Sequence, residues 1–227
     1  MPDAIDYRQV ADTEQAAQAA LDIVLTAAAA AISARGRFVL ALSGGRTPGQ
    51  LYRLLADTDQ DWERWHLVYG DERCLPLGHV ERTATMVSQH WLDPVGFPKE
   101  NHHVPAVELG AVVAAEKYSE TLLPLLPLDL ALLGMGEDGH TASLFPGHSH
   151  PDLAVVPVFD APKPPPERIS LGYETLRSAR STCVLVTGNG KQQALRQWLA
   201  GQGELPVARA LAPGRTILVT DLPEPAD

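Results

Sequence analysis

The segment FVLALSGGRTPGQLYRLL, residues 38–55, predicts a complete structural unit. Residues 38–42 form a short apolar run of strand length, and the glycines at 44 and 45 follow it closely. From Pro48 onward, leucines at 51, 54 and 55 recur at the spacing of one helical face, which predicts a helix over residues 48–55. The segment therefore predicts a strand, a glycine-containing loop and a helix in succession, which is the repeating unit of an α/β fold.

The same pattern recurs along the chain. Asp12 and Gln15 are spaced as in a capping box, and the alanine-rich run after them predicts a long helix that stops at Gly36. Further predicted strands cover residues 65–69, 128–133, 182–186 and 215–220, and further helices cover 83–91, 111–123 and 191–199. Alternating buried strands and helices predict a mostly parallel sheet flanked by helices on both faces, a Rossmann-like arrangement. We expect residues 1–227 to form a single domain, with the proline-rich stretch 161–166 as a surface connection.

Composition and charge exclude several classes of protein. Apolar residues make up 45% of the 227 residues and charged residues 20%, as in soluble globular proteins. The 28 acidic residues outnumber the 18 basic ones, giving a net charge of −10, which argues against nucleic acid as a partner. The acidic start of the chain shows no secretory signal, and the longest apolar stretch is too short to span a membrane. With only two cysteines, we expect a cytoplasmic protein without a disulfide framework.

Two glycine loops have the form of anion-binding sites. Ser43, Gly44, Gly45, Arg46 and Thr47 lie between a predicted strand and a predicted helix, where free amides favour a negative charge. Lys191 begins the helix after the loop 187–190, where a bound phosphate would offset the unfavourable position of the lysine against the helix dipole. By their residues alone, these segments are equally compatible with a tight turn and a solvated lysine.

The segment LLGMGEDGHTASLFP, residues 132–146, is the strongest catalytic candidate. Three glycines in six residues precede His140 and predict a loop that places an imidazole at the end of a strand. Histidine is the side chain best suited to general acid–base catalysis near neutral pH. Asp71 and Arg73 follow another predicted strand, where they could orient a base and stabilise an oxyanion, or form an ordinary solvated loop.

In combination, these segments resemble the 6-phosphogluconolactonase family. The resemblance rests on Ser43-Gly44-Gly45 with Thr47-Pro48, on Asp71-Glu72-Arg73, and on the long segment from Gly134 to Pro146. Pro164-Pro165 through Arg168-Ile169-Ser170-Leu171, and Thr187-Gly188 with Lys191, follow in the family's order. The resemblance spans roughly residues 35–220 and implies the glucosamine-6-phosphate deaminase-like fold.

The resemblance also implies an activity and a set of roles. It implies hydrolysis of 6-phospho-D-glucono-1,5-lactone to 6-phospho-D-gluconate, without metal or cofactor, by a monomer or small homo-oligomer. His140 would take a proton from water, Asp71 would orient His140, and Arg73 would lie near the oxyanion. The phosphate of the substrate would be held by Arg168, Lys191 and the 43–47 loop. The residues assigned to substrate binding are Ser43, Gly44, Gly45, Arg46, Thr47, Gly139, Arg168 and Lys191.

Two departures from the family pattern and two alternatives remain. The small polar residue usual after the two glycines is Arg46 here, and Arg82-Thr83 replaces a usual Ser-Asn pair. Both changes are expected to add positive charge near the phosphate.

Glucosamine-6-phosphate deaminase is the nearest alternative, although Arg73 and the sequence after His140 favour the lactonase. A non-catalytic sugar-phosphate sensor is the other alternative, but the short acidic segment before the first strand leaves little room for a DNA-binding motif.

Overall fold

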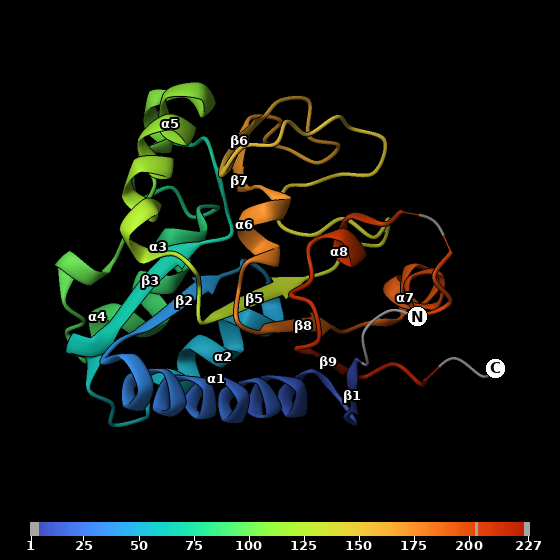
Figure 1. Ribbon diagram of the computed structural model, residues 1–227, viewed down its shortest axis with the longest axis horizontal. Coiled ribbons are helices and arrows are strands. Elements are labelled where there is room, and N and C mark those ends of the chain that lie inside the picture. Colours follow the sequence, from blue (N-terminus) through green and yellow to red (C-terminus); the bar gives the residue numbers. More distant parts are fainter. Residues whose placement is uncertain (1–4, 203, 225–227) are drawn as a thin grey trace.

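The computed structural model describes residues 5–202 and 204–224 (Figure 1). Residues 1–4 belong to the N-terminal stretch in which we found no secretory signal. They lie outside the described residues. The strands are β1 (Asp6–Gln9), β2 (Phe38–Leu42), β3 (Trp65–Tyr69), β4 (Asp71–Arg73), β5 (Leu130–Gly134), β6 (Val155–Val158), β7 (Arg168–Leu171), β8 (Thr182–Val186) and β9 (Thr216–Thr220). The helices are α1 (Thr13–Arg35), α2 (Arg46–Ala56), α3 (Thr83–Val87), α4 (Asp93–Val95), α5 (Ala111–Leu122), α6 (Tyr173–Arg177), α7 (Gln192–Leu199) and α8 (Pro206–Arg209). Short 3-10 turns cover Trp62–Arg64, Lys99–Asn101, Val107–Leu109, Leu123–Leu125 and Asn189–Lys191.

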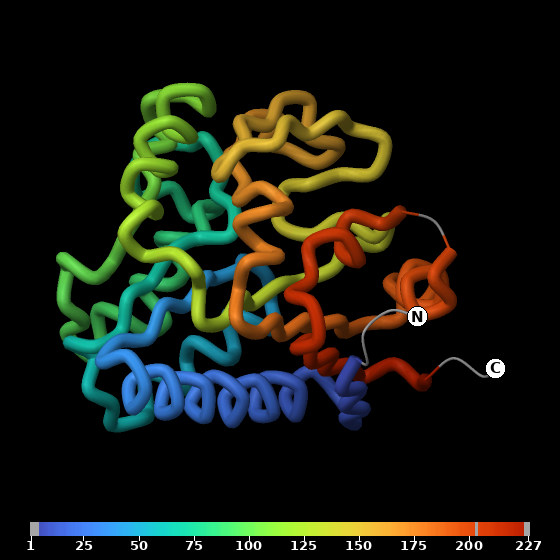
Figure 2. Tube along the Cα trace, in the orientation of Figure 1, coloured from blue at the N-terminus to red at the C-terminus, as the bar shows by residue number. Residues whose placement is uncertain are grey.

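Within the described ranges, the larger sheet has six strands in the order β1-β9-β8-β5-β2-β3, and all neighbouring strands are parallel. The first and last strands therefore lie side by side (Figure 2). The chain runs from β2 outward to β3 and then returns to place β5 on the other side of β2. The strand order thus reverses between β2 and β5, and ligands of open α/β sheets bind at such a reversal, beyond the carboxyl ends of the strands.

A second sheet, which we did not predict, packs above the first. It has three antiparallel strands in the order β4-β7-β6. The chain passes between the sheets at Gly70, whose amide donates to Leu42 O and whose carbonyl accepts from Leu171 N. A Cβ at Gly70 would lie 3.2 Å from the Leu42 carbonyl oxygen, so glycine suits this crossing. As a result, Asp71–Arg73 is not a solvated loop, which was one of the two interpretations of its sequence. It extends the chain from β3 into the second sheet.

Helices cover both sides of the main sheet, as expected. Helices α1 and α2 lie below it, while α5, α6 and the second sheet lie above (Figure 1). The predicted start and stop of α1 are confirmed, since Asp12 accepts the Gln15 amide at 2.8 Å and Gly36 adopts a left-handed conformation. By length and composition α1 could cross a membrane, but its buried side chains pack in the core.

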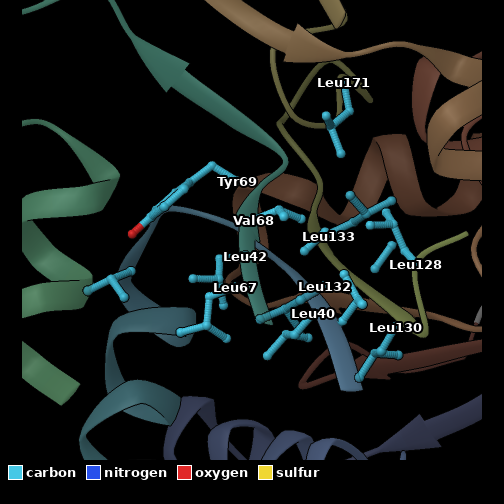
Figure 3. Close-up of a cluster of buried hydrophobic side chains, with 14 of the residues drawn as sticks. Leu40, Leu42, Leu67, Val68, Tyr69, Leu128, Leu130, Leu132, Leu133 and Leu171 are labelled. Atoms are coloured by element: carbon cyan, nitrogen blue, oxygen red, sulfur yellow. The ribbon is translucent and has the colours of Figure 1, made fainter. Parts of the chain in front are cut away.

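The core confirms the predicted strands. Strands β2 and β8 are buried at every position, as continuous apolar runs in parallel sheets predict. Leucines from β2, β3 and β5 pack together beside Leu171 of the second sheet (Figure 3). The helix predicted over residues 83–91 is less regular than expected, because α3 passes into a π-helical turn at Ser88–Leu92 before α4.

Candidate active site

The loops that follow β2, β5 and β8 meet the second sheet at the carboxyl edge of the main sheet. They enclose a cavity of about 210 Å³. Its walls come from these residues: Ser43, Gly44, Gly45, Asp71, Arg73, Thr83, Gly134, Met135, Gly136, His140, Ala142, Arg168 and Lys191. Candidate residues that are far apart in the sequence are therefore brought to one place, at the reversal of the strand order.

A compact glycine loop carries His140 into this cavity. The His140 carbonyl accepts the Gly136 amide at 2.9 Å, and the Thr141 hydroxyl donates to Gly134 O at 2.7 Å. A Cβ at Gly136 would overlap the His140 ring, so this position requires the absence of a side chain. The imidazole consequently packs directly on the backbone of its own loop, with 23% of the side chain exposed.

The carboxylate that contacts His140 is Asp138, and not Asp71 as we expected. Asp138 Oδ1 lies 2.5 Å from His140 Nδ1. Because a carboxylate only accepts, Nδ1 carries the hydrogen of this bond, and in the neutral imidazole the lone pair is then on Nε2. Burial acts to raise the pKa of Asp138, but the hydrogen bonds from His140 outweigh burial and lower it. Asp138 therefore stays ionised beside the imidazole.

Asp71 has a different partner. Its Oδ2 accepts the Ser143 hydroxyl at 2.6 Å, and Ser143 is fully buried. Asp71 thereby ties β4 to the segment that follows His140. The backbone conformation of β4 places Arg73 in the same wall, where its Nη1 donates to Glu81 O at 2.7 Å.

Two further cations enter the cavity from different elements. Arg168, on β7, is only 7% exposed and donates to the carbonyls of the proline-rich segment, with Nη2 2.7 Å from Lys163 O. Burial lowers the pKa of Arg168, while the charge of Asp71 opposes this shift. Burial also lowers the pKa of Lys191, against the charges of Asp221 and Glu137. Both cations are thus partly desolvated, and a bound anion would restore the interactions that they lose.

A second cavity, of about 240 Å³, shares Gly44, Gly45, Gly134 and Lys191 with the first. It is also lined by Arg46 and Thr47 at the start of α2. The Thr47 hydroxyl lies 2.8 Å from the Thr187 hydroxyl, which joins the first and last glycine loops. The 43–47 loop therefore separates two connected spaces, and Arg46 faces the one that does not contain His140.

Two sequence expectations need correction. Gly139 does not line either cavity described above, because its amide donates to Gly136 O and its carbonyl accepts from Val207 N. Arg82 adds no charge to the cavity, because it is 1% exposed and lies between Glu72 and Glu108 at 3.8 and 3.4 Å. Thr83, in contrast, does line the site.

Sequence reasoning missed two contributors besides Asp138. Glu72 is fully buried and accepts the amides of Arg73, Thr83 and Ala84 at 2.8–2.9 Å. The available signal was its place in the charged run Asp71-Glu72-Arg73, directly after an apolar strand. Phe145 lies against His140, and nothing in the local pattern distinguished it from other core residues. Within residues 5–202 and 204–224, no group of three or more His, Cys, Asp or Glu side chains has the arrangement of a metal site.

Comparison with known proteins agrees with this geometry. Residues 11–219 match the family described as glucosamine-6-phosphate isomerases/6-phosphogluconolactonase. The chain belongs to this family. A 6-phosphogluconolactonase of Streptomyces coelicolor is 36% identical over 233 residues, covering 92% of this chain and 89% of the relative. The human 6-phosphogluconolactonase is 36% identical over 206 residues, covering 84% and 79%.

Solved structures extend the similarity to the fold. The 6-phosphogluconolactonase from Thermotoga maritima matches with a TM-score of 0.89 at 25% identity, covering 96% of this chain and 99% of that one. A fold match this complete confirms the expected arrangement of a mostly parallel sheet between helices. Since these relatives are hydrolases, the chain is an enzyme of that kind.

Proposed function

We propose that this enzyme hydrolyses 6-phospho-D-glucono-1,5-lactone to 6-phospho-D-gluconate, the second reaction of the oxidative pentose phosphate pathway. The observation that carries the proposal is the single cavity lined by His140 together with Arg73, Arg168 and Lys191. A base and several cations in one small cavity suit a substrate that has a reactive ester at one end and a phosphate at the other. The names of the relatives support the same substrate.

In the proposed mechanism, His140 Nε2 removes a proton from a water molecule as the water oxygen attacks the lactone carbonyl. The negative charge that develops on the carbonyl oxygen is stabilised by Arg73. The tetrahedral intermediate then collapses, the bond to the ring oxygen breaks, and the imidazolium returns its proton to that oxygen. Asp138 stabilises the imidazolium through Nδ1, and catalysis of this kind typically contributes ~10²–10⁴-fold.

Substrate binding is assigned to the cations and the glycine loop that line the same cavity. Arg168 and Lys191 hold the phosphate, together with the loop of Ser43, Gly44, Gly45 and Thr47. The Ser43 hydroxyl is buried and has no hydrogen-bond partner in the described part of the chain, which leaves it available to an anion. Holding the phosphate orients the lactone and contributes to rate as well as to affinity.

The other properties inferred from the sequence stay predictions. They are a single domain over residues 1–227, a cytoplasmic location, a monomer or small homo-oligomer, and activity without metal, cofactor, nucleic acid or membrane.

The test generates the lactone in situ with glucose-6-phosphate dehydrogenase and measures its disappearance above the spontaneous rate. We expect wild type to accelerate the reaction and His140→Ala to lose ~10²–10⁴-fold in kcat, because the base is removed. His148→Ala, an exposed histidine of the same segment, is the control and should keep kcat within about twofold.

Two results would count against the proposal. No acceleration by the folded wild-type protein would exclude the lactonase, and ammonia release from glucosamine 6-phosphate would then identify the deaminase. Wild-type turnover by His140→Ala would leave the function in place and exclude the mechanism.

A further inference from the structure

One aromatic ring contacts both the candidate base and a candidate phosphate ligand. Phe145 is 3% exposed, and its ring centroid lies 4.8 Å from that of His140, with the planes at 49°. On the same ring, the guanidinium carbon of Arg168 lies 5.8 Å from the centroid, within cation–π range. Phe145 thus contacts both the proposed general base and the proposed phosphate ligand.

The loop of His140 cannot position the imidazole by itself. The hydrogen bond to Asp138 comes from two residues earlier in the same loop, and the packing surface at Gly136 belongs to that loop too. Contacts within one loop move with it, so they orient the ring relative to the loop but not relative to Arg168. Ser143 ties the backbone after His140 to Asp71 and Ser170, but holding the ring itself relative to Arg168 requires a contact with the ring from outside the loop.

Phe145 provides that contact because it is anchored in the second sheet. Its side chain packs in a small buried cluster with Val156, Val158 and Ala161. Val158 pairs with Arg168 in the register of β6 and β7, so the cluster and the arginine share one rigid hairpin. The Phe145 amide also donates to His150 Nε2 at 3.1 Å, which fixes its backbone.

We propose that Phe145 is a positioning residue that sets the place of the His140 imidazole relative to Arg168. This inference rests on the proposed function, in which His140 acts on the carbonyl while Arg168 holds the phosphate of the same molecule. Phe145 itself touches neither the water nor the lactone. Its effect is to keep the proton acceptor aligned with a substrate anchored from the second sheet.

The test compares Phe145→Leu, Phe145→Tyr and Val156→Ala. Since small misplacements of a catalytic group cost up to ~10²-fold, we expect Phe145→Leu to lower kcat by ~10–100-fold and to change KM by less than about fivefold. Phe145→Tyr keeps the ring and should restore kcat to within about fivefold of wild type. Val156→Ala removes some packing from the same cluster but keeps the ring and its other neighbours, Val158 and Ala161, and should keep kcat within about twofold.

A second readout separates positioning from a general loss of packing. In Phe145→Leu, the NMR resonance of the His140 Cε1 proton should lose the ring-current shift of its aromatic neighbour, and Val156→Ala should leave it unchanged. If Phe145→Leu does not fold, Phe145→Met is measured in its place, since it has similar volume and no ring.

The outcomes distinguish this inference from the function on which it rests. An inactive His140→Ala together with a fully active Phe145→Leu would overturn the positioning role alone. Equal losses of kcat in Phe145→Leu and Val156→Ala would also overturn it, because a packing defect would then suffice. An unchanged kcat in His140→Ala would overturn the proposed mechanism.

Discussion

Asp71 and Asp138 are two carboxylates near one histidine, and their partners assign them different roles. Asp138 contacts His140 Nδ1, whereas Asp71 accepts from the buried Ser143 hydroxyl. Asp138 therefore acts on the charge and tautomer of the imidazole. Asp71 acts on the path of the chain after His140, by tying β4 to that segment.

At this scale, Asp138→Asn tests the role of the charge. We expect kcat to fall at least ~10-fold with little change in KM, because an amide stabilises the imidazolium less and can also favour the wrong tautomer. The measurement is steady-state kinetics of lactone hydrolysis. Glu137→Gln changes the neighbouring acid, for which the structure shows no hydrogen bond to His140, and should keep kcat within about threefold. Equal kcat values for the two variants would contradict the role of Asp138.

At the scale of elements, the three-residue strand β4 has more influence than its length suggests. It pairs with β7 on one side and presents Glu72 to the first amides of α3 on the other. Free amides and the helix dipole at a helix N-terminus favour a carboxylate there. Through Glu72, two walls of the cavity, at Arg73 and Thr83, are fixed relative to each other.

Glu72→Ala should therefore destabilise the protein. The substitution leaves three amides without their acceptor and Arg82 without one of its two carboxylates, and removing one member of a buried ion pair typically costs ~3–5 kcal/mol. The free energy of unfolding is measured by guanidinium titration. Glu81→Ala, an exposed acid in the adjoining loop, is the control and should change it by less than ~0.5 kcal/mol. A loss no larger than that of the control would show that Glu72 is not required for folding.

At the scale of the whole molecule, β3 contacts both the active site and a cluster of three histidines. His66, His102 and His103 are not among the residues that line the active-site cavity. The strand ends at Tyr69, just before Gly70 and Asp71 enter the site. The Tyr69 hydroxyl lies 2.6 Å from His102 Nε2, and the neighbouring rings of His66 and His103 stack with centroids 5.5 Å apart. Burial lowers the pKa of all three histidines, and lowers that of His102 to about 4.

This cluster predicts a loss of stability in mild acid. Between pH 6.5 and 4 the unfolded chain binds a proton at His102 that the folded chain does not bind, so stability falls as the pH falls through this range. We expect wild type to lose of order 1–3 kcal/mol more than His102→Asn between pH 7.5 and 4.5, with a smaller slope remaining from His66 and His103. Guanidinium titrations at several pH values measure the difference. An unchanged slope in His102→Asn would contradict the prediction.

The sequence alone determined five of the six strands described in the main sheet and most of the candidate site. Buried parallel strands are continuous apolar runs, and glycine loops after them are visible without any knowledge of packing, so β2, β3, β5, β8 and β9 were predictable. Because such strands share one carboxyl edge, the proximity of His140 to Lys191 and the 43–47 loop followed from the fold class. The resemblance to the family added Arg168 and assigned the roles of Asp71 and Arg73.

Only the tertiary structure decided which of these residues interact. The second sheet is built from three- and four-residue strands, whose pairing depends on distant partners and leaves no periodic signal. The charge of Arg82 was visible in the sequence, but its burial between two glutamates was not. The partner of His140 is only two residues away, yet which carboxylate reaches Nδ1 depends on the fold of the glycine loop. Local hydrophobic pattern encodes strands and loops, whereas side-chain contacts depend on the three-dimensional path of the chain. For that reason sequence reasoning found most residues of the site but not their partners.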